Sequence, residues 1–167
     1  MHYHNITKDD MLNGEGIRVV LWVAGCGHAC PGCHNPITWD ETGGLPFDDA
    51  AKAEVFAELK KDYVSGITLS GGDPLYPANR DEVTALCREI RESFSNKTIW
   101  LYTGYLYEEI RTLPVMACID VLVDGRFEQQ SADPQLCWRG SRNQRVIDMK
   151  RTYSSKRVVP LHETAQE

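Results

Sequence analysis

Arg18-Val19-Val20-Leu21-Trp22-Val23-Ala24-Gly25-Cys26 is the most informative run of the chain for its architecture, because it is short, apolar and rich in β-branched residues. Such a run is typical of a strand buried on both faces of a parallel sheet. Similar runs predict further strands at 66–70, 98–102 and 121–123, each followed by a glycine-containing turn. We therefore expect four buried strands, each leading into a loop that carries polar or sulfur side chains.

Helical patterns lie between these strands. The first spans 48–61 with Asp48 as its N-cap, and the second spans 79–94, where Asn79 and Glu82 have the spacing of a capping box. Strands that alternate with helices favour parallel βαβ units and an α/β fold, either an open sheet or an incomplete barrel. Ligands of such folds bind at the carboxyl ends of the strands.

Length and composition restrict the classes of protein. The 167 residues, 42% of them hydrophobic, suffice for one domain, which we place at 1–148; we expect 149–167 to form a C-terminal arm or tail that is disordered in part. A net charge of −6 argues against nucleic-acid binding. We expect a cytoplasmic location and no membrane contact, because neither a secretory signal nor a long apolar run is visible.

Three cysteines follow the first predicted strand within eight residues, in the segment Cys26-Gly27-His28-Ala29-Cys30-Pro31-Gly32-Cys33. Three clustered thiolates suit an iron–sulfur cluster or zinc. A zinc site completed by His28 or His34 is one alternative, and a dithiol redox pair of Cys30 and Cys33 is another. Of the remaining cysteines, Cys87 lies on an apolar helix face and is expected to pack in the core, whereas Cys118 and Cys137 match no ligand spacing.

Motifs in a fixed order carry a resemblance to a known family. Cys-x3-Cys-x2-Cys after the first strand, followed by Ser70-Gly71-Gly72-Asp73-Pro74 after the second, resembles the radical S-adenosylmethionine superfamily. The segment Asn13 to Arg18 resembles glycyl-radical activating enzymes. The extended cysteine motif is similar to that of the activases of anaerobic ribonucleotide reductases, and so are the segments Trp100–Tyr105, Val123–Phe127 and Trp138–Arg145.

The resemblance implies a shortened partial (βα) barrel, open on one side, with one 4Fe-4S cluster held by Cys26, Cys30 and Cys33. It implies that S-adenosylmethionine binds the open iron and is cleaved reductively to methionine and a 5′-deoxyadenosyl radical. Asp73 would accept a hydrogen bond from the ammonium group of this cofactor, while Thr103 and Asp124 would either contact it or serve as cap and turn residues. The full set of expected cofactor-binding residues is Gly32, Cys33, His34, Ser70, Gly71, Gly72, Asp73, Thr103 and Asp124.

The resemblance also implies a protein substrate. The radical would pass to a backbone glycine in the large subunit of an anaerobic ribonucleoside-triphosphate reductase, and a low-potential donor of the flavodoxin or ferredoxin type would supply the electron. Two alternatives remain at this point: an activase of another glycyl-radical enzyme such as a formate lyase, and a non-catalytic zinc-binding module.

Overall fold

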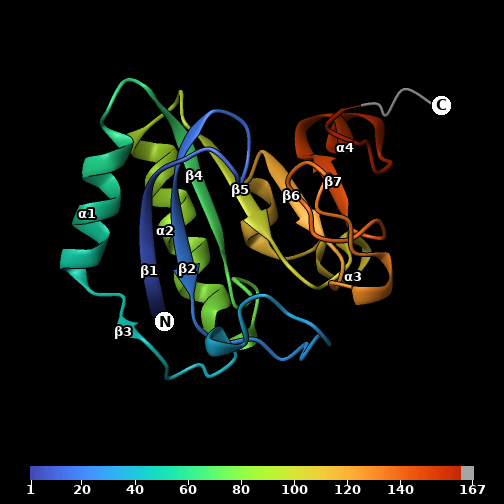
Figure 1. Ribbon diagram of the computed structural model, residues 1–167. Helices are drawn as coiled ribbons and strands as arrows, with labels where there is room; N and C mark the ends of the chain where they lie inside the picture. The colour runs from blue at the N-terminus through green and yellow to red at the C-terminus, as the bar shows by residue number, and fades with distance from the viewer. Residues whose placement is uncertain (163–167) are drawn as a thin grey trace.

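A computed structural model describes residues 1–162, which form a seven-stranded mixed sheet of order β3-β1-β2-β4-β5-β6-β7 (Figure 1). The four central strands β2, β4, β5 and β6 run parallel, and β1, β3 and β7 pair antiparallel to their neighbours. Strand bounds are β1 His2–Asp10, β2 Ile17–Val23, β3 Leu45–Pro46, β4 Val64–Gly71, β5 Thr98–Tyr102, β6 Val121–Asp124 and β7 Arg145–Asp148. The expected α/β class and open, mostly parallel sheet are confirmed.

Helices connect the parallel strands. The α-helices are α1 Asp49–Leu59, α2 Arg80–Ser93, α3 Tyr107–Ile110 and α4 Met149–Ser155, and the 3-10 turns are η1 Pro36–Thr38, η2 Pro77–Asn79, η3 Pro114–Ala117 and η4 Gln129–Ser131. None of the helices in residues 1–162 is long and apolar enough to cross a membrane.

The two faces of the sheet differ because successive side chains of a strand point to opposite sides. Val19, Leu21 and Val23 of β2 join the main core, which also contains the buried residues of α1 and α2. The opposite face carries a smaller cluster around Trp100, against which Trp138 packs. On this second face the fully buried guanidinium of Arg18 lies 5.2 Å from the Trp100 ring centroid, and burial lowers its pKa to about 10.

The two predicted helix caps had different outcomes. The Asp48 carboxylate accepts a hydrogen bond from the Ala51 amide at 2.9 Å, so the N-cap of α1 is confirmed. The capping box at Asn79 was wrong, because its side chain makes no cap hydrogen bond. The Asn79 amide instead donates to the backbone oxygens of Ala24 at 2.7 Å and Asp73 at 3.2 Å. It therefore links α2 to the loops that follow β2 and β4.

Residues after the sheet pack against its last strand. Met149 is fully buried at the start of α4, and Pro160 forms a bridge with Ile147 of β7. The expected division between a domain ending at residue 148 and a C-terminal arm stays a prediction. Partial disorder within 149–167 likewise stays a prediction, and residues 163–167 of that segment lie outside the described residues.

Candidate functional site

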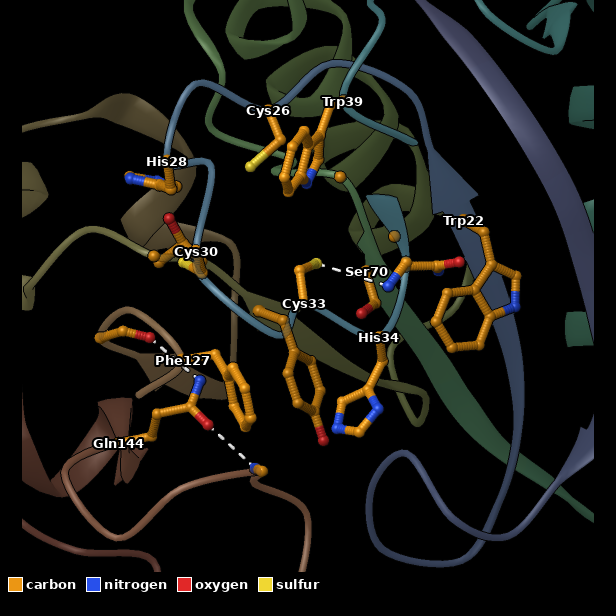
Figure 2. A pocket seen from close by; sticks show the side chains of 18 of the residues that line it. Trp22, Cys26, His28, Cys30, Cys33, His34, Trp39, Ser70, Phe127 and Gln144 are labelled. Carbon is orange, nitrogen blue, oxygen red and sulfur yellow. Dashed lines mark hydrogen bonds between the residues drawn. The ribbon is translucent and has the colours of Figure 1, made fainter. Parts of the chain in front are cut away.

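A cavity of about 310 Å³ lies where β2, β4 and β5 end (Figure 2). All three clustered cysteines line it, as do residues from the ends of these strands and from the segments after β6 and before β7. The lining residues are Asn13, Trp22, Cys26, His28, Cys30, Cys33, His34, Asn35, Trp39, Ser70, Gly71, Gly72, Tyr102, Thr103, Gly104, Gly125, Phe127, Gly140 and Gln144. The cavity therefore occupies the edge of the sheet where ligands of α/β folds bind.

Backbone hydrogen bonds hold the cysteine loop in place. The amides of Gly25 and Cys26 donate to the carbonyls of Thr38 and Trp39 at 2.8 and 3.1 Å. At the third cysteine, the Asn35 amide donates to Cys33 Sγ at 3.4 Å. A donor aimed at this sulfur stabilises the thiolate that a metal ligand must become.

The arrangement of the three thiols differs from that of a site for a single metal ion. Within residues 1–162, no three His, Cys, Asp or Glu side chains are close enough together to bind a single metal ion. All six cysteines are free, and Cys26, Cys30 and Cys33 surround one part of the cavity (Figure 2). A cluster binds each thiolate through a different iron, so three thiols spread around a cavity fit a cluster.

His28 bonds to a carboxylate on the neighbouring loop. Its Nε2 lies 2.6 Å from Asp73 Oδ2, and both side chains are buried. The same Asp73 oxygen accepts hydrogen bonds from Thr103 Oγ1 at 2.9 Å and the Gly104 amide at 3.0 Å, while Oδ1 accepts from the Leu75 amide at 2.7 Å. One carboxylate thus joins the loops that follow β2, β4 and β5.

The Gly71-Gly72 turn forms the wall beside the cysteine loop. A Cβ atom at Gly72 would lie 2.5 Å from the Gly25 carbonyl oxygen and 2.8 Å from that of Thr38, so only glycine fits. The Gly72 amide donates to Val23 O at 2.8 Å, and the Asp73 amide donates to Gly25 O at 2.7 Å. Two loops are thereby held close together, with backbone rather than side chains at the cavity wall.

Most of the predicted site residues meet at this cavity. Cys26, Cys30, Cys33, His34, Ser70, Gly71, Gly72 and Thr103 all line it. Gly32, Asp73 and Asp124 are not part of its lining. Gly32 faces the side chain of Gln129, and the Asp73 side chain is only 1% exposed, with protein donors on both of its oxygens. In this structure Asp73 joins the cavity loops together, and its expected contact with an ammonium group stays a prediction.

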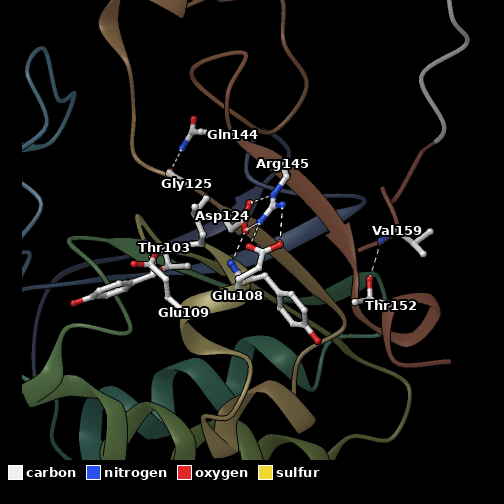
Figure 3. Close-up of polar contacts among 12 residues, drawn as sticks. Thr103, Glu108, Glu109, Asp124, Gly125, Gln144, Arg145, Thr152 and Val159 are labelled. Carbon is white, nitrogen blue, oxygen red and sulfur yellow. Dashed lines mark hydrogen bonds and ion pairs between the residues drawn. The ribbon is translucent and has the colours of Figure 1, made fainter. Parts of the chain in front are cut away.

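Asp124 is bonded to an arginine (Figure 3). Its fully buried carboxylate accepts from Arg145 Nε at 2.9 Å and from the Tyr107 amide at 2.7 Å. Arg145 also pairs with Glu108 at 2.8 Å, and this hydrogen bond lowers the pKa of Glu108. Asp124 therefore connects the start of α3 to the start of β7. Its neighbour Gly125 lines the cavity.

Sequence reasoning missed several lining residues. Trp22, Trp39 and Phe127 supply aromatic walls, with the His34 ring 5.3 Å from that of Phe127 (Figure 2). Gln144 accepts from the amides of Gly140 and Ser141 and donates to Gly125 O at 3.0 Å. Two signals were available: Trp22 lies on the face of β2 opposite Leu21 and Val23, and the family-like segments Val123–Phe127 and Trp138–Arg145 contain Phe127 and Gln144.

The chain is similar to known proteins over most of its length. A family model described as a 4Fe-4S single cluster domain matches residues 12–147. The chain is 44% identical over 146 residues to the anaerobic ribonucleoside-triphosphate reductase-activating protein of Enterobacteria phage T4, covering 87% of this chain and 93% of that one. It is 43% identical over 154 residues to the protein of the same name from Escherichia coli K12, covering 90% and 100%.

Both comparisons agree with the geometry of the cavity. The matched region contains the four parallel strands β2, β4, β5 and β6 and all three cavity cysteines. Radical S-adenosylmethionine enzymes of this type use one 4Fe-4S cluster together with S-adenosylmethionine. This chain belongs to the family of anaerobic ribonucleoside-triphosphate reductase-activating proteins and contains their 4Fe-4S radical S-adenosylmethionine domain.

Proposed function

We propose that this chain generates a glycyl radical on the large subunit of an anaerobic ribonucleoside-triphosphate reductase. The observation that carries the proposal is the position of three thiols from one loop in a cavity that Ser70, Gly71 and Gly72 also line. The names of the relatives, which describe activation of this reductase, support the same partner.

Cys26, Cys30 and Cys33 are the proposed ligands of the cluster. Three protein ligands leave one of four irons without a side chain, which gives S-adenosylmethionine a place to bind. When bound and reduced, the cluster supplies the electron that cleaves this cofactor and produces the hydrogen-abstracting radical. Burial raises the pKa of the Cys26 thiol, so binding of iron there must displace its proton.

The remaining lining residues bind and position the ligand and shield it from water. Gly71 and Gly72 let a ligand approach the backbone closely. Thr103 also lines the cavity, and its hydrogen bond to Asp73 fixes its side chain there. Trp39, Phe127 and His34 supply ring surfaces that exclude water from the cavity. Asp73 acts in this proposal as a positioning residue, because its carboxylate contacts three loops rather than the cavity.

The test is formation of the radical on the partner. The anaerobically prepared activase would be mixed with S-adenosylmethionine, a low-potential reductant and the reductase large subunit. We expect a carbon-centred doublet in the electron paramagnetic resonance spectrum that changes when the reductase glycines are deuterated. Cys33→Ala should give no signal. If S-adenosylmethionine is cleaved and a doublet forms on a formate lyase but not on the reductase, the assignment of the reductase as partner is wrong.

The electron donor is a finer part of this proposal. We propose a flavodoxin or ferredoxin, since reduction of such a cluster needs a low-potential protein. Replacing the chemical reductant by each purified donor and measuring methionine release distinguishes them.

A further inference from the structure

The part of the cysteine loop that carries Cys30 and Cys33 makes only local hydrogen bonds. Within residues 1–162, the hydrogen bonds of residues 29–34 run from the Cys33 amide to Cys30 O at 3.1 Å and from the Asn35 amide to Cys33 Sγ at 3.4 Å. Four of these six residues are exposed. The positions of the second and third thiols therefore depend on packing against other segments.

The segment that follows β6 packs against this part of the loop on both sides of Cys33. A Cβ atom on Gly32 would lie 2.9 Å from Gln129 Cδ, so the Gln129 side chain covers this glycine. On the other side, the centroid of the His34 ring lies 5.3 Å from that of Phe127 (Figure 2). Two side chains from one short segment thus flank the third cysteine.

Residues 125–129, which we name the bracing strip, are held in turn by side chains from the segment that precedes and enters β7. Each of these side chains bonds to the backbone of a different residue of the strip. The three hydrogen bonds run from Gln144 Nε2 to Gly125 O at 3.0 Å (Figure 3), from Asn143 Nδ2 to Arg126 O at 2.7 Å, and from the Glu128 amide to Ser141 Oγ at 3.1 Å.

The side chains that hold the strip are themselves fixed. Ser141 is fully buried, and Gln144 Oε1 accepts hydrogen bonds from the amides of Gly140 and Ser141 at 2.9 and 3.1 Å. Earlier in the same segment, the Trp138 ring packs against the Trp100 ring of β5, with the centroids 5.0 Å apart. The bracing strip is therefore connected to the sheet through this segment.

Asn143 separates positioning from direct contact with a ligand. Its side chain is exposed and is not part of the cavity lining, whereas Gln144 is. Besides its bond to Arg126 O, its oxygen accepts from Ser131 Oγ at 3.1 Å, just after the strip. An effect of Asn143 on a molecule in the cavity must therefore act through the backbone that it holds.

We propose that Ser141, Asn143 and Gln144 are positioning residues for the cluster and for S-adenosylmethionine. By holding the bracing strip, they keep Cys33 in place as a cluster ligand and Phe127 in place at the cavity wall. Contacts behind the ligands of a metal site commonly control how firmly the metal is held. This inference rests on the proposed ligand role of Cys33 and does not depend on which protein receives the radical.

The test measures binding of S-adenosylmethionine and retention of the cluster. Cluster-loaded Asn143→Leu, Ser141→Ala and the control Arg142→Met would be prepared anaerobically. Arg142 lies between the two test positions, and its exposed side chain pairs with Asp133, outside the bracing strip. Titration of the electron paramagnetic resonance spectrum of the reduced cluster gives the Kd of S-adenosylmethionine. The loss of cluster absorbance gives the rate at which an iron chelator removes the cluster.

We expect Asn143→Leu and Ser141→Ala each to raise the Kd about fivefold, which corresponds to about 1 kcal/mol, the contribution of one hydrogen bond. The chelator should remove the cluster about fivefold faster from both variants. Arg142→Met should stay within twofold of the unaltered protein in both measurements.

Kinetics distinguish positioning from a general loss of folded protein. In slow cleavage of S-adenosylmethionine without the reductase, Asn143→Leu should raise KM and leave kcat unchanged. A smaller folded fraction would instead lower kcat and leave KM unchanged.

Three results would count against the proposal in different ways. Equal Kd values and chelation rates in Asn143→Leu and the unaltered protein would overturn it, and so would equal weakening in Arg142→Met. A full cluster in Cys33→Ala, measured by iron analysis, would overturn the ligand assignment and this proposal with it. If the strip variants behave as expected but no reductase acquires a radical, the partner assignment is wrong and the role of the bracing strip stands.

Discussion

His28 and Asp73 are 45 residues apart in sequence, yet Nε2 of one lies 2.6 Å from Oδ2 of the other. The pair connects the cysteine loop to the turn after β4, and the Thr103 and Gly104 donors extend the connection to β5. The position of the cluster ligands relative to the glycine turn therefore depends on a side-chain contact as well as on backbone hydrogen bonds.

A double-mutant cycle should reveal this contact in the cluster-free protein. His28→Leu, Asp73→Asn and the double variant would be unfolded in urea, and we expect a coupling free energy of about 2 kcal/mol, typical of a hydrogen bond to a charged group. A cycle of His28→Leu with Thr152→Val, on α4, should give less than about 0.5 kcal/mol. Equal coupling in both cycles would mean that the variants act through general loosening of the fold.

Cluster content should depend on the three cavity cysteines alone. Anaerobically prepared protein should contain about four iron and four sulfide per chain, and Cys26→Ala, Cys30→Ala or Cys33→Ala should lose them. Cys87→Ala should keep them, because Cys87 is fully buried in the core, where burial raises its pKa to about 12. Iron and sulfide analysis makes the comparison, and a full cluster in Cys30→Ala would disprove the ligand assignment.

Arg145→Met should destabilise the fold strongly. The change leaves the fully buried Asp124 carboxylate without its cation, which costs about 3 kcal/mol in the free energy of unfolding. Arg142→Met is the matched control, since Arg142 is exposed and its pairing with Asp133 contributes less than about 1 kcal/mol. Urea unfolding measures both. Similar losses in the two variants would rule out a special role for the Asp124 pair.

Tyr102→Phe should stabilise the cluster-free protein. The Tyr102 hydroxyl is buried and has no hydrogen-bond partner among residues 1–162, and burial raises its pKa, which keeps it protonated. Removing an unsatisfied buried hydroxyl should raise the free energy of unfolding by about 1 kcal/mol. The exposed Tyr153→Phe should change it by less than about 0.5 kcal/mol. A loss of stability in Tyr102→Phe would show that the hydroxyl has a partner in solution.

The parallel strands could be predicted because their signal is local. β2, β4, β5 and β6 are continuous apolar runs, and burial on both faces requires such runs. β1 was not predicted, because His2-Tyr3-His4-Asn5-Ile6-Thr7 alternates only weakly and lies near the sheet edge, where polar side chains are tolerated. The four residues of β7 were likewise too short and too mixed to identify.

Within the site, the loop positions could be predicted and the contacts could not. Three cysteines and a glycine turn at strand ends are visible in the sequence. The direction in which Asp73 points depends on His28, Thr103 and Gly104, which come from two other loops, and no local pattern encodes that meeting. The capping box predicted at Asn79 was wrong for the same reason. The Asn79 side chain donates to the distant backbone oxygen of Ala24 and does not cap the helix.

Gly104 limits how related sequences can vary. A Cβ atom at this position would overlap the His28 ring, which also packs edge-on against Tyr105 with its centroid 4.6 Å away. A side chain at position 104 is therefore costly while the imidazole is present, and it fits only when a smaller side chain replaces His28. Homologous chains that carry a side chain at position 104 should lack an imidazole at position 28, so the two positions should diverge as a pair over evolutionary time.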